Sequence, residues 1–177
     1  MNTFPNPGLA RMDRSPWQVV AAVTLGIWLG GSLLLDVVVM PALYSAGMMT
    51  SPGFAAAGSL LFGTVNRVEL LMGGLVLAAF LALLAAGRRS TWCLVVGLAL
   101  CGLTAIEAYW LAPTMAASSL SLTWGELGPI APALSPLMTG WHEGYFAIEV
   151  LKWLGCAALL WNCELSLIHI SEPTRPY

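Results

Sequence analysis

Residues 16–39 read PWQVVAAVTLGIWLGGSLLLDVVV, and Asp36 is the single charged residue among them. A helix of about 20 residues rises about 30 Å, which is the thickness of the hydrocarbon layer of a bilayer. This stretch is therefore long and apolar enough to cross a membrane. Three further apolar stretches follow at residues 65–86, 92–111 and 143–161. The sequence predicts an all-α fold, a four-helix transmembrane bundle over residues 16–162, with residues 1–15 as a cytoplasmic N-terminal segment.

The composition excludes a soluble globular domain. Hydrophobic residues make up 58% of the chain and charged residues 9%, whereas soluble domains carry about 25% charged residues. The apolar run that follows Arg11 and Arg14 is longer than the core of about 7–15 residues in a cleavable signal peptide, so we expect the first span to be retained. The expected partner is the lipid bilayer. A net charge of −2 and the lack of a basic run predict no nucleic-acid partner.

The C-terminal segment differs abruptly from the rest of the chain. Residues 165–177 read LSLIHISEPTRPY, which resembles the translation of an adapter used to prepare sequencing libraries. We expect this segment to be a non-native tail, and we therefore leave it out of fold and site arguments. His169 is then no candidate ligand, and His142 is the remaining histidine.

The arginines predict the orientation of the bundle. Arg11 and Arg14 precede the first span, and Arg88 and Arg89 lie between the second and third spans. The other two connections, residues 40–63 and 112–141, contain neither lysine nor arginine. Because short cytoplasmic loops of membrane proteins are enriched in these residues, we expect both termini to be cytoplasmic.

Two features of the spans concern their packing. One helix over residues 54–86 would be about 50 Å long, so we expect a short interfacial helix at residues 54–63 and a break or kink near Gly63. Small residues at Gly26, Gly30, Gly73 and Gly74 would let neighbouring helices approach closely.

Every predicted span places polar residues in one layer, in the outer half of the bundle. The layer consists of Asp36, Asn66, Arg67, Glu69, Glu107, Glu149 and Lys152. Four carboxylates against two cations would leave two excess negative charges, which are costly in or near hydrocarbon. Protons on some carboxylates, or a bound cation, are expected to balance this charge.

The layer has two interpretations. Ionisable residues inside a membrane are functional candidates, so the acids could handle a proton or cation with Arg67 and Lys152 as counter-charges. The alternative is a non-transporting scaffold or subunit in which the same groups fix the helix register and Arg67 reaches the interface. Four spans leave little room for alternating access, so transport would require a homo-oligomer or a partner subunit. An enzyme is the less favoured interpretation. The chain has no GxSxG motif, and His142 is its single histidine once the C-terminal tail is left out.

Methionines suggest a metal as a third possibility. Met48 and Met49 lie in an outer connection, and His142 lies at the outer start of the fourth span. Thioether and imidazole groups bind Cu(I), so these three residues form a candidate copper site. Methionine is equally a common filler of apolar segments.

Four stretches together resemble a known family. They are LLLDVVVMPALYSAGMM from Leu33, GFAAAGSLLFGTVNRVELL from Gly53, LAPTM from Leu111 and HEGYFAIEVLKW from His142. They resemble an uncharacterised family of four-helix bacterial membrane proteins, a domain of unknown function common in cyanobacteria, over about residues 17–162. That family is distantly similar to the copper-resistance D-like membrane domain and to a eukaryotic four-helix transmembrane protein linked to metal-drug resistance. The resemblance implies a multi-pass protein of a bacterial inner membrane or thylakoid and makes metal handling plausible, but it assigns no catalytic residue.

Overall fold

A computed structural model describes residues 15–48, 53–87, 91–117 and 136–168 of the chain. The predicted N-terminal segment and C-terminal tail lie mostly outside these residues, as do Met49, Arg88 and Arg89. The described elements are α1 (Pro16–Leu33), the π-helical turn η1 (Leu34–Val39), α2 (Met40–Ser45), α3 (Phe54–Ala85), α4 (Thr91–Ile106), the π-helical turn η3 (Glu107–Leu111) and α6 (Pro136–Ile168).

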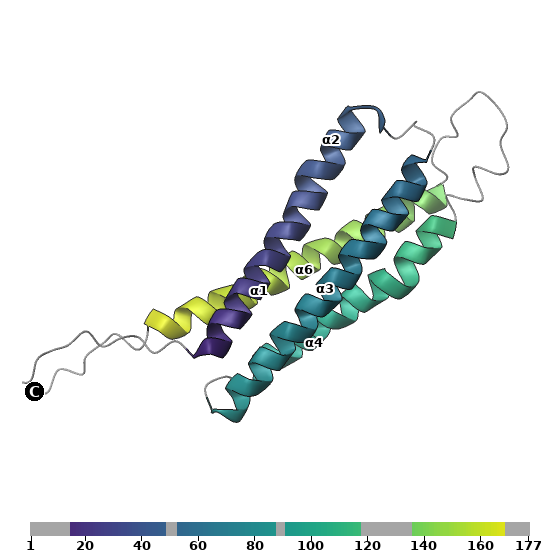
Figure 1. Cartoon of the computed structure of the whole chain (residues 1–177). Coiled ribbons are helices and arrows are strands. Elements are labelled where there is room, and N and C mark those ends of the chain that lie inside the picture. The colour runs from purple at the N-terminus through teal and green to yellow at the C-terminus, as the bar shows by residue number, and fades with distance from the viewer. Residues whose placement is uncertain (1–14, 49–52, 88–90, 118–135, 169–177) are drawn as a thin grey trace, which may run out of the picture.

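These elements form four long helices, and the described residues contain no strand. Four segments are long and apolar enough to cross a membrane: Pro16–Ser45, Ala56–Ala85, Thr91–Ala117 and Gly140–Cys163. The first helix, α1, packs against α3 and α6, and α4 packs against α3 and α6 from the other side. Figure 1 shows that α1 begins and α6 ends at the same end of the bundle. The prediction of an all-α bundle with four spans is confirmed.

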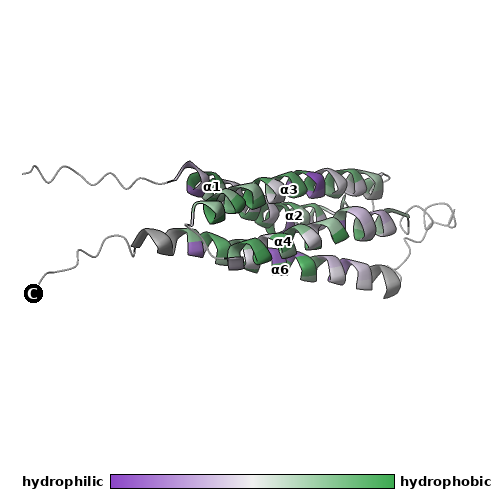
Figure 2. Ribbon diagram, turned by 90° about the horizontal axis from the view of Figure 1, so that it is seen from below, coloured by the Kyte–Doolittle hydropathy of each residue, from purple (hydrophilic) through white to green (hydrophobic). Residues whose placement is uncertain are grey.

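The core and the outer surface are both apolar, as expected for a protein in lipid. Side chains from all four long helices fill the centre: Ala21, Leu25, Trp28, Val76, Ala79, Phe80, Leu83, Cys93, Leu100, Cys156, Leu159 and Cys163. Large apolar side chains such as Leu71, Leu98, Leu154 and Trp161 are exposed on the outside, and hydrophobic residues recur along all the long helices (Figure 2). Such a surface would be a liability in water but suits contact with acyl chains.

The four helices are longer than the predicted spans, and each is longer at its outer end. The first reaches Ser45, the second begins at Phe54, the third continues to residue 117 and the fourth begins at Pro136. Apolar composition ends where the lipid interface begins, but backbone hydrogen bonding continues beyond that point because each group in or near lipid needs a partner. As a result, the polar residues lie closer to the middle of the helices than the sequence suggested.

The break predicted near Gly63 does not form. α3 is a continuous helix of 32 residues that begins after Gly53, whose φ of 86° favours glycine. An interruption at Gly63 would leave backbone groups unpaired in an apolar environment, which costs several kcal/mol per group. The uninterrupted helix avoids this cost and places Glu69 at its midpoint.

Both π-helical turns end two residues before a proline. The N–H of Met40 donates to the carbonyl of Leu35, and Pro41 follows. The N–H of Ala112 likewise donates to the carbonyl of Glu107, and Pro113 follows. Proline has no N–H and its ring displaces the carbonyl four residues earlier, so a wider turn with bonds five residues apart accommodates it. The first turn contains Asp36 and the second begins at Glu107, so each wide turn carries an acid of the predicted layer.

Among the four glycines expected at close helix contacts, Gly73 is the one that makes such a contact. A Cβ atom at Gly73 would lie 2.6 Å from Cys101 Sγ of α4 and 3.3 Å from the Trp28 ring of α1. A Cβ atom at Gly26, Gly30 or Gly74 would have no other atom within 4 Å. Close packing of three helices therefore depends on Gly73, whereas the other three glycines leave open space.

Candidate functional site

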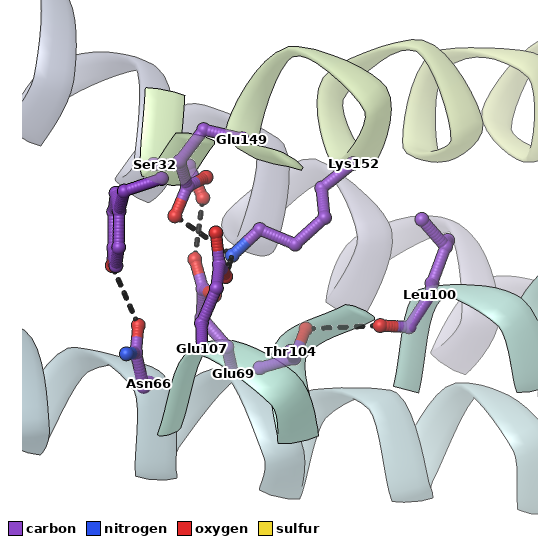
Figure 3. A network of polar contacts seen from close by, with 9 residues as sticks. Ser32, Asn66, Glu69, Leu100, Thr104, Glu107, Glu149 and Lys152 are labelled. Atoms are coloured by element: carbon purple, nitrogen blue, oxygen red, sulfur yellow. Dashed lines mark hydrogen bonds and ion pairs between the residues drawn. The ribbon is translucent and has the colours of Figure 1, made fainter. Parts of the chain in front are cut away.

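Three glutamates converge on one lysine in the interior of the bundle. Lys152 Nζ lies 2.5 Å from Glu69 Oε2, 2.5 Å from Glu107 Oε2 and 2.7 Å from Glu149 Oε1. The ammonium group thus donates one hydrogen bond to each carboxylate (Figure 3). These four residues form what we call the carboxylate cluster.

Three of the four long helices contribute to the carboxylate cluster. Glu69 comes from α3, Glu107 from the first position of η3, and Glu149 and Lys152 from α6. Residues three apart share one face of a helix, which brings Glu149 and Lys152 together. All four side chains are buried, with Lys152 1% and Glu107 0% exposed. Ion pairs this far from solvent are poorly screened, so the geometry of the charges matters strongly.

The charges of the carboxylate cluster do not balance. Three carboxylates against one ammonium leave two excess negative charges if every acid is ionised. Glu107 Oε1 and Glu149 Oε2 are buried and have no hydrogen-bond partner among the described residues. A buried carboxylate oxygen normally accepts hydrogen bonds or binds a cation. The cluster therefore has the capacity to take up protons or a further cation.

Hydrogen bonds connect the carboxylate cluster to other helices. Ser32 Oγ of α1 donates to Glu69 Oε1 at 2.6 Å, so Glu69 is bonded to both α1 and α6. Tyr145 of α6 donates from its hydroxyl to Asn66 Oδ1 of α3 at 2.9 Å. The Phe62 ring packs edge-on against Tyr145 with ring centroids 5.3 Å apart. The polar groups thus join α1, α3 and α6.

The structure does not bring every predicted residue into the carboxylate cluster. Asp36 is half-buried, and its Oδ2 has no hydrogen-bond partner among the described residues. Arg67 is exposed, and all three ion pairs found in the described part of the chain involve Lys152. Asn66 lies next to the cluster and bonds Tyr145. The predicted layer therefore separates into a buried cluster and a peripheral set.

The predicted copper ligands do not belong to the carboxylate cluster. His142 and Met48 are both exposed, and Met49 lies outside the described residues. Among the described residues, Glu69, Glu107 and Glu149 form a group that could hold a metal ion, with one oxygen from each within 4.8 Å of the others. Three carboxylates suit hard cations that prefer oxygen, such as Mg²⁺ or Mn²⁺, more than Cu(I).

Two hydrogen bonds in and beside the cluster, those of Tyr145 and Ser32, were not predicted from the sequence. Tyr145 lies four residues before Glu149 and hence on the same face of α6, a spacing that could have identified it. Ser32 lies four residues before Asp36 in the chain, a spacing that favours a contact within one helix, but its hydroxyl bonds Glu69 of another helix. Spacing along one helix does not reveal such cross-helix partners.

Comparison with known proteins gives limited further information. No family model matches the chain, and no solved structure matches it. The inner membrane transport protein YajR of Escherichia coli strain K12 is 29% identical over 135 residues, which cover 69% of this chain and 30% of YajR. The chain thus spans less than a third of the length of this curated relative. The present protein is thus a multi-pass membrane protein. Part of its chain is similar to an inner membrane transport protein.

Proposed function

We propose that this protein binds a proton or a small cation at the carboxylate cluster and moves it across the membrane. The observation that carries the proposal is the charge imbalance: Lys152 neutralises one of three buried carboxylates, and two carboxylate oxygens remain without a partner. Two uncompensated charges in an apolar interior would be strongly destabilising. Protons or a cation that balance them would make the folded protein a binder of that species.

The position of the cluster supports a role in transport more than in surface binding. Glu69 lies at the midpoint of α3, and the whole cluster is buried among helices that are long enough to cross a membrane. A species bound there has to pass along the interior of the bundle to reach either side. The partial similarity to an inner membrane transport protein agrees with this proposal, and we place the protein in a bacterial inner membrane.

The donor set favours a proton or a hard cation over copper at this cluster. Copper binding by His142, Met48 and Met49 remains a separate prediction. Copper content of the purified protein after incubation with Cu(I), compared with that of His142→Ala, tests it. Equal copper content in both proteins would contradict a site that includes His142.

The competing function is a structural one. Ser32, Glu69 and Lys152 connect three helices through hydrogen bonds, which favours a scaffold whose charges hold the bundle together. A scaffold requires these bonds but no exchange of protons or ions. The two functions therefore differ in whether loss of a carboxylate stops ion movement in a protein that is still folded. A homo-oligomer or partner subunit is compatible with both.

The first prediction tests this difference. Full-length protein in liposomes is assayed for proton and Mn²⁺ movement with internal dyes, alongside Glu107→Gln and Glu149→Gln. We expect movement in the native protein and at least tenfold less in each variant, because the glutamine side chain keeps its size but neither ionises nor binds a cation comparably. Glu143→Gln, which changes an exposed acid of α6, is the matched control and should keep native rates. Equal rates in all four proteins, or no movement in any of them, would refute the proposal. A structural scaffold would then be the remaining function.

A further inference from the structure

A cavity of about 210 Å³ lies between α1 and α3. Its walls include Ile27, Val65, Val68 and Met72, and its polar lining residues are Ser32, Thr64 and Glu69. Glu69 is also a member of the carboxylate cluster, so the cavity extends from an apolar wall to the buried charges. A ligand with one apolar and one polar end would match this lining.

The cavity lies at the lipid-facing seam between two neighbouring helices. Ile27 is 56% exposed and Val68 is 43% exposed, so both side chains reach the outer surface while lining the cavity. Gly31 is an exposed residue of the lining, and a Cβ atom there would meet no atom within 4 Å. Because Gly31 has no side chain, the cavity is open toward the lipid at this position of α1. A molecule dissolved in the bilayer can therefore enter between α1 and α3 without first passing through water.

The polar end of the cavity is suited to a cation. Glu69 Oε1 accepts one hydrogen bond, from Ser32, and a carboxylate oxygen can accept a second. Trp28, 2% exposed, also lines the cavity. Tryptophan is the aromatic side chain that binds cations best. Once an ammonium ion has formed there, the carboxylates of the cluster stabilise its positive charge.

We propose that this cavity binds a hydrophobic primary amine that enters from the bilayer. The ammonium group contacts Glu69 and Ser32, and the first carbons of the alkyl chain contact Ile27 and Val68. The cavity is smaller than pockets for drug-sized ligands, which hold about 300–1,000 Å³, so the rest of the chain stays among the lipid tails. This inference rests on the proposed function, because the proton that the amine receives is one that the carboxylate cluster has taken up.

The proton balance of this binding avoids moving a net charge through lipid. The amine crosses the acyl chains as the neutral base. A protonated carboxyl of the cluster transfers its proton to the amine nitrogen, which leaves an ammonium ion next to a carboxylate. The O–H bond breaks, the N–H bond forms, and the total charge of protein plus ligand is unchanged.

The test uses radiolabelled n-octylamine and lipid nanodiscs that contain the full chain, with empty nanodiscs as the background. Gly31→Leu fills the opening, and Gly30→Leu is the matched control, because Gly30 is the adjacent exposed glycine and does not line the cavity. We expect saturable binding to the native protein that unlabelled octylamine displaces and n-octanol does not. Affinity should fall at least tenfold in Gly31→Leu and in Glu69→Gln and stay within twofold of native in Gly30→Leu.

Three outcomes would overturn the inference. The first is no saturable binding to the native protein, and the second is equal affinity in Gly30→Leu and Gly31→Leu. The third is a change of oligomeric state in Gly31→Leu without amine binding to the native protein, which would show that a second copy covers the cavity. Ion movement by the same preparations is measured separately, through Glu107→Gln and Glu149→Gln. Normal ion movement without amine binding would remove this inference and keep the proposed function. Amine binding without ion movement would keep this inference and proton uptake by the cluster, but would remove transport from the proposed function.

Discussion

At the scale of single residues, Lys152 takes part in all three ion pairs of the described part of the chain. Its ammonium group donates to three carboxylates and is 1% exposed, so no water compensates these acids if the lysine is lost. Removing one partner of a buried ion pair typically costs about 3–5 kcal/mol, because the remaining charge stays buried. Replacing all partners together with neutral groups of similar size is often tolerated.

We therefore predict that Lys152→Met lowers the free energy of unfolding by about 3–5 kcal/mol. The measurement is reversible unfolding in mixed micelles, followed by helical circular dichroism. Adding Glu69→Gln, Glu107→Gln and Glu149→Gln to Lys152→Met should recover most of the loss, since no buried charge then lacks a partner. Arg67→Met, which removes an exposed cation of α3, is the control and should change stability by less than about 0.5 kcal/mol. A similar loss in both single variants would contradict the structural role of Lys152.

At the scale of helices, small residues and prolines determine how the spans approach and where their acids point. Gly73 lets α3 contact α1 and α4 closely. The π-helical turns before Pro41 and Pro113 each add one residue to a helical turn, which rotates the remainder of the helix relative to a regular α-helix. Glu107 is the first residue of such a turn, so the position of its carboxylate depends on Pro113.

The prediction at this scale concerns Gly73 and its neighbour. Gly73→Ala should destabilise the protein by about 1–3 kcal/mol, because the new Cβ atom would lie 2.6 Å from Cys101 Sγ and one helix has to shift. Gly74→Ala adds the same methyl group in open space and should be neutral or slightly stabilising. Unfolding in mixed micelles compares the two. Combining Gly73→Ala with Cys101→Ala should restore stability, and failure to do so would mean that the clash lies elsewhere.

For the whole molecule, the arrangement of the helices agrees with the placement of arginine along the chain. The beginning of α1, the end of α3, the beginning of α4 and the end of α6 all lie at one end of the bundle (Figure 1). The arginines at positions 11, 14, 88 and 89 belong to the segments joined to that end. The opposite end joins the connections that contain no lysine or arginine.

We predict that this arginine-rich end faces the cytoplasm, as the positive-inside rule requires. Fusions of a reporter that is active only in the cytoplasm to the N-terminus and to the end of α6 should both be active. A fusion after α2, at Gly47, should be inactive. Moving the four arginines to the opposite connections should reduce or invert this pattern. An active fusion at Gly47 in the native chain would contradict the orientation.

The sequence by itself determined the number of spans, because the thickness of a bilayer sets the length of an apolar helix. It also predicted that Glu69, Glu107, Glu149 and Lys152 lie at similar depth. Only the tertiary structure decided that these four residues meet while Asp36 and Arg67 lie outside the cluster. Helical spacing determines which residues share a face of one helix, but the rotation of each helix toward its neighbours depends on packing. Contacts such as Gly73 against Cys101, and the wide turns before prolines, set that rotation here.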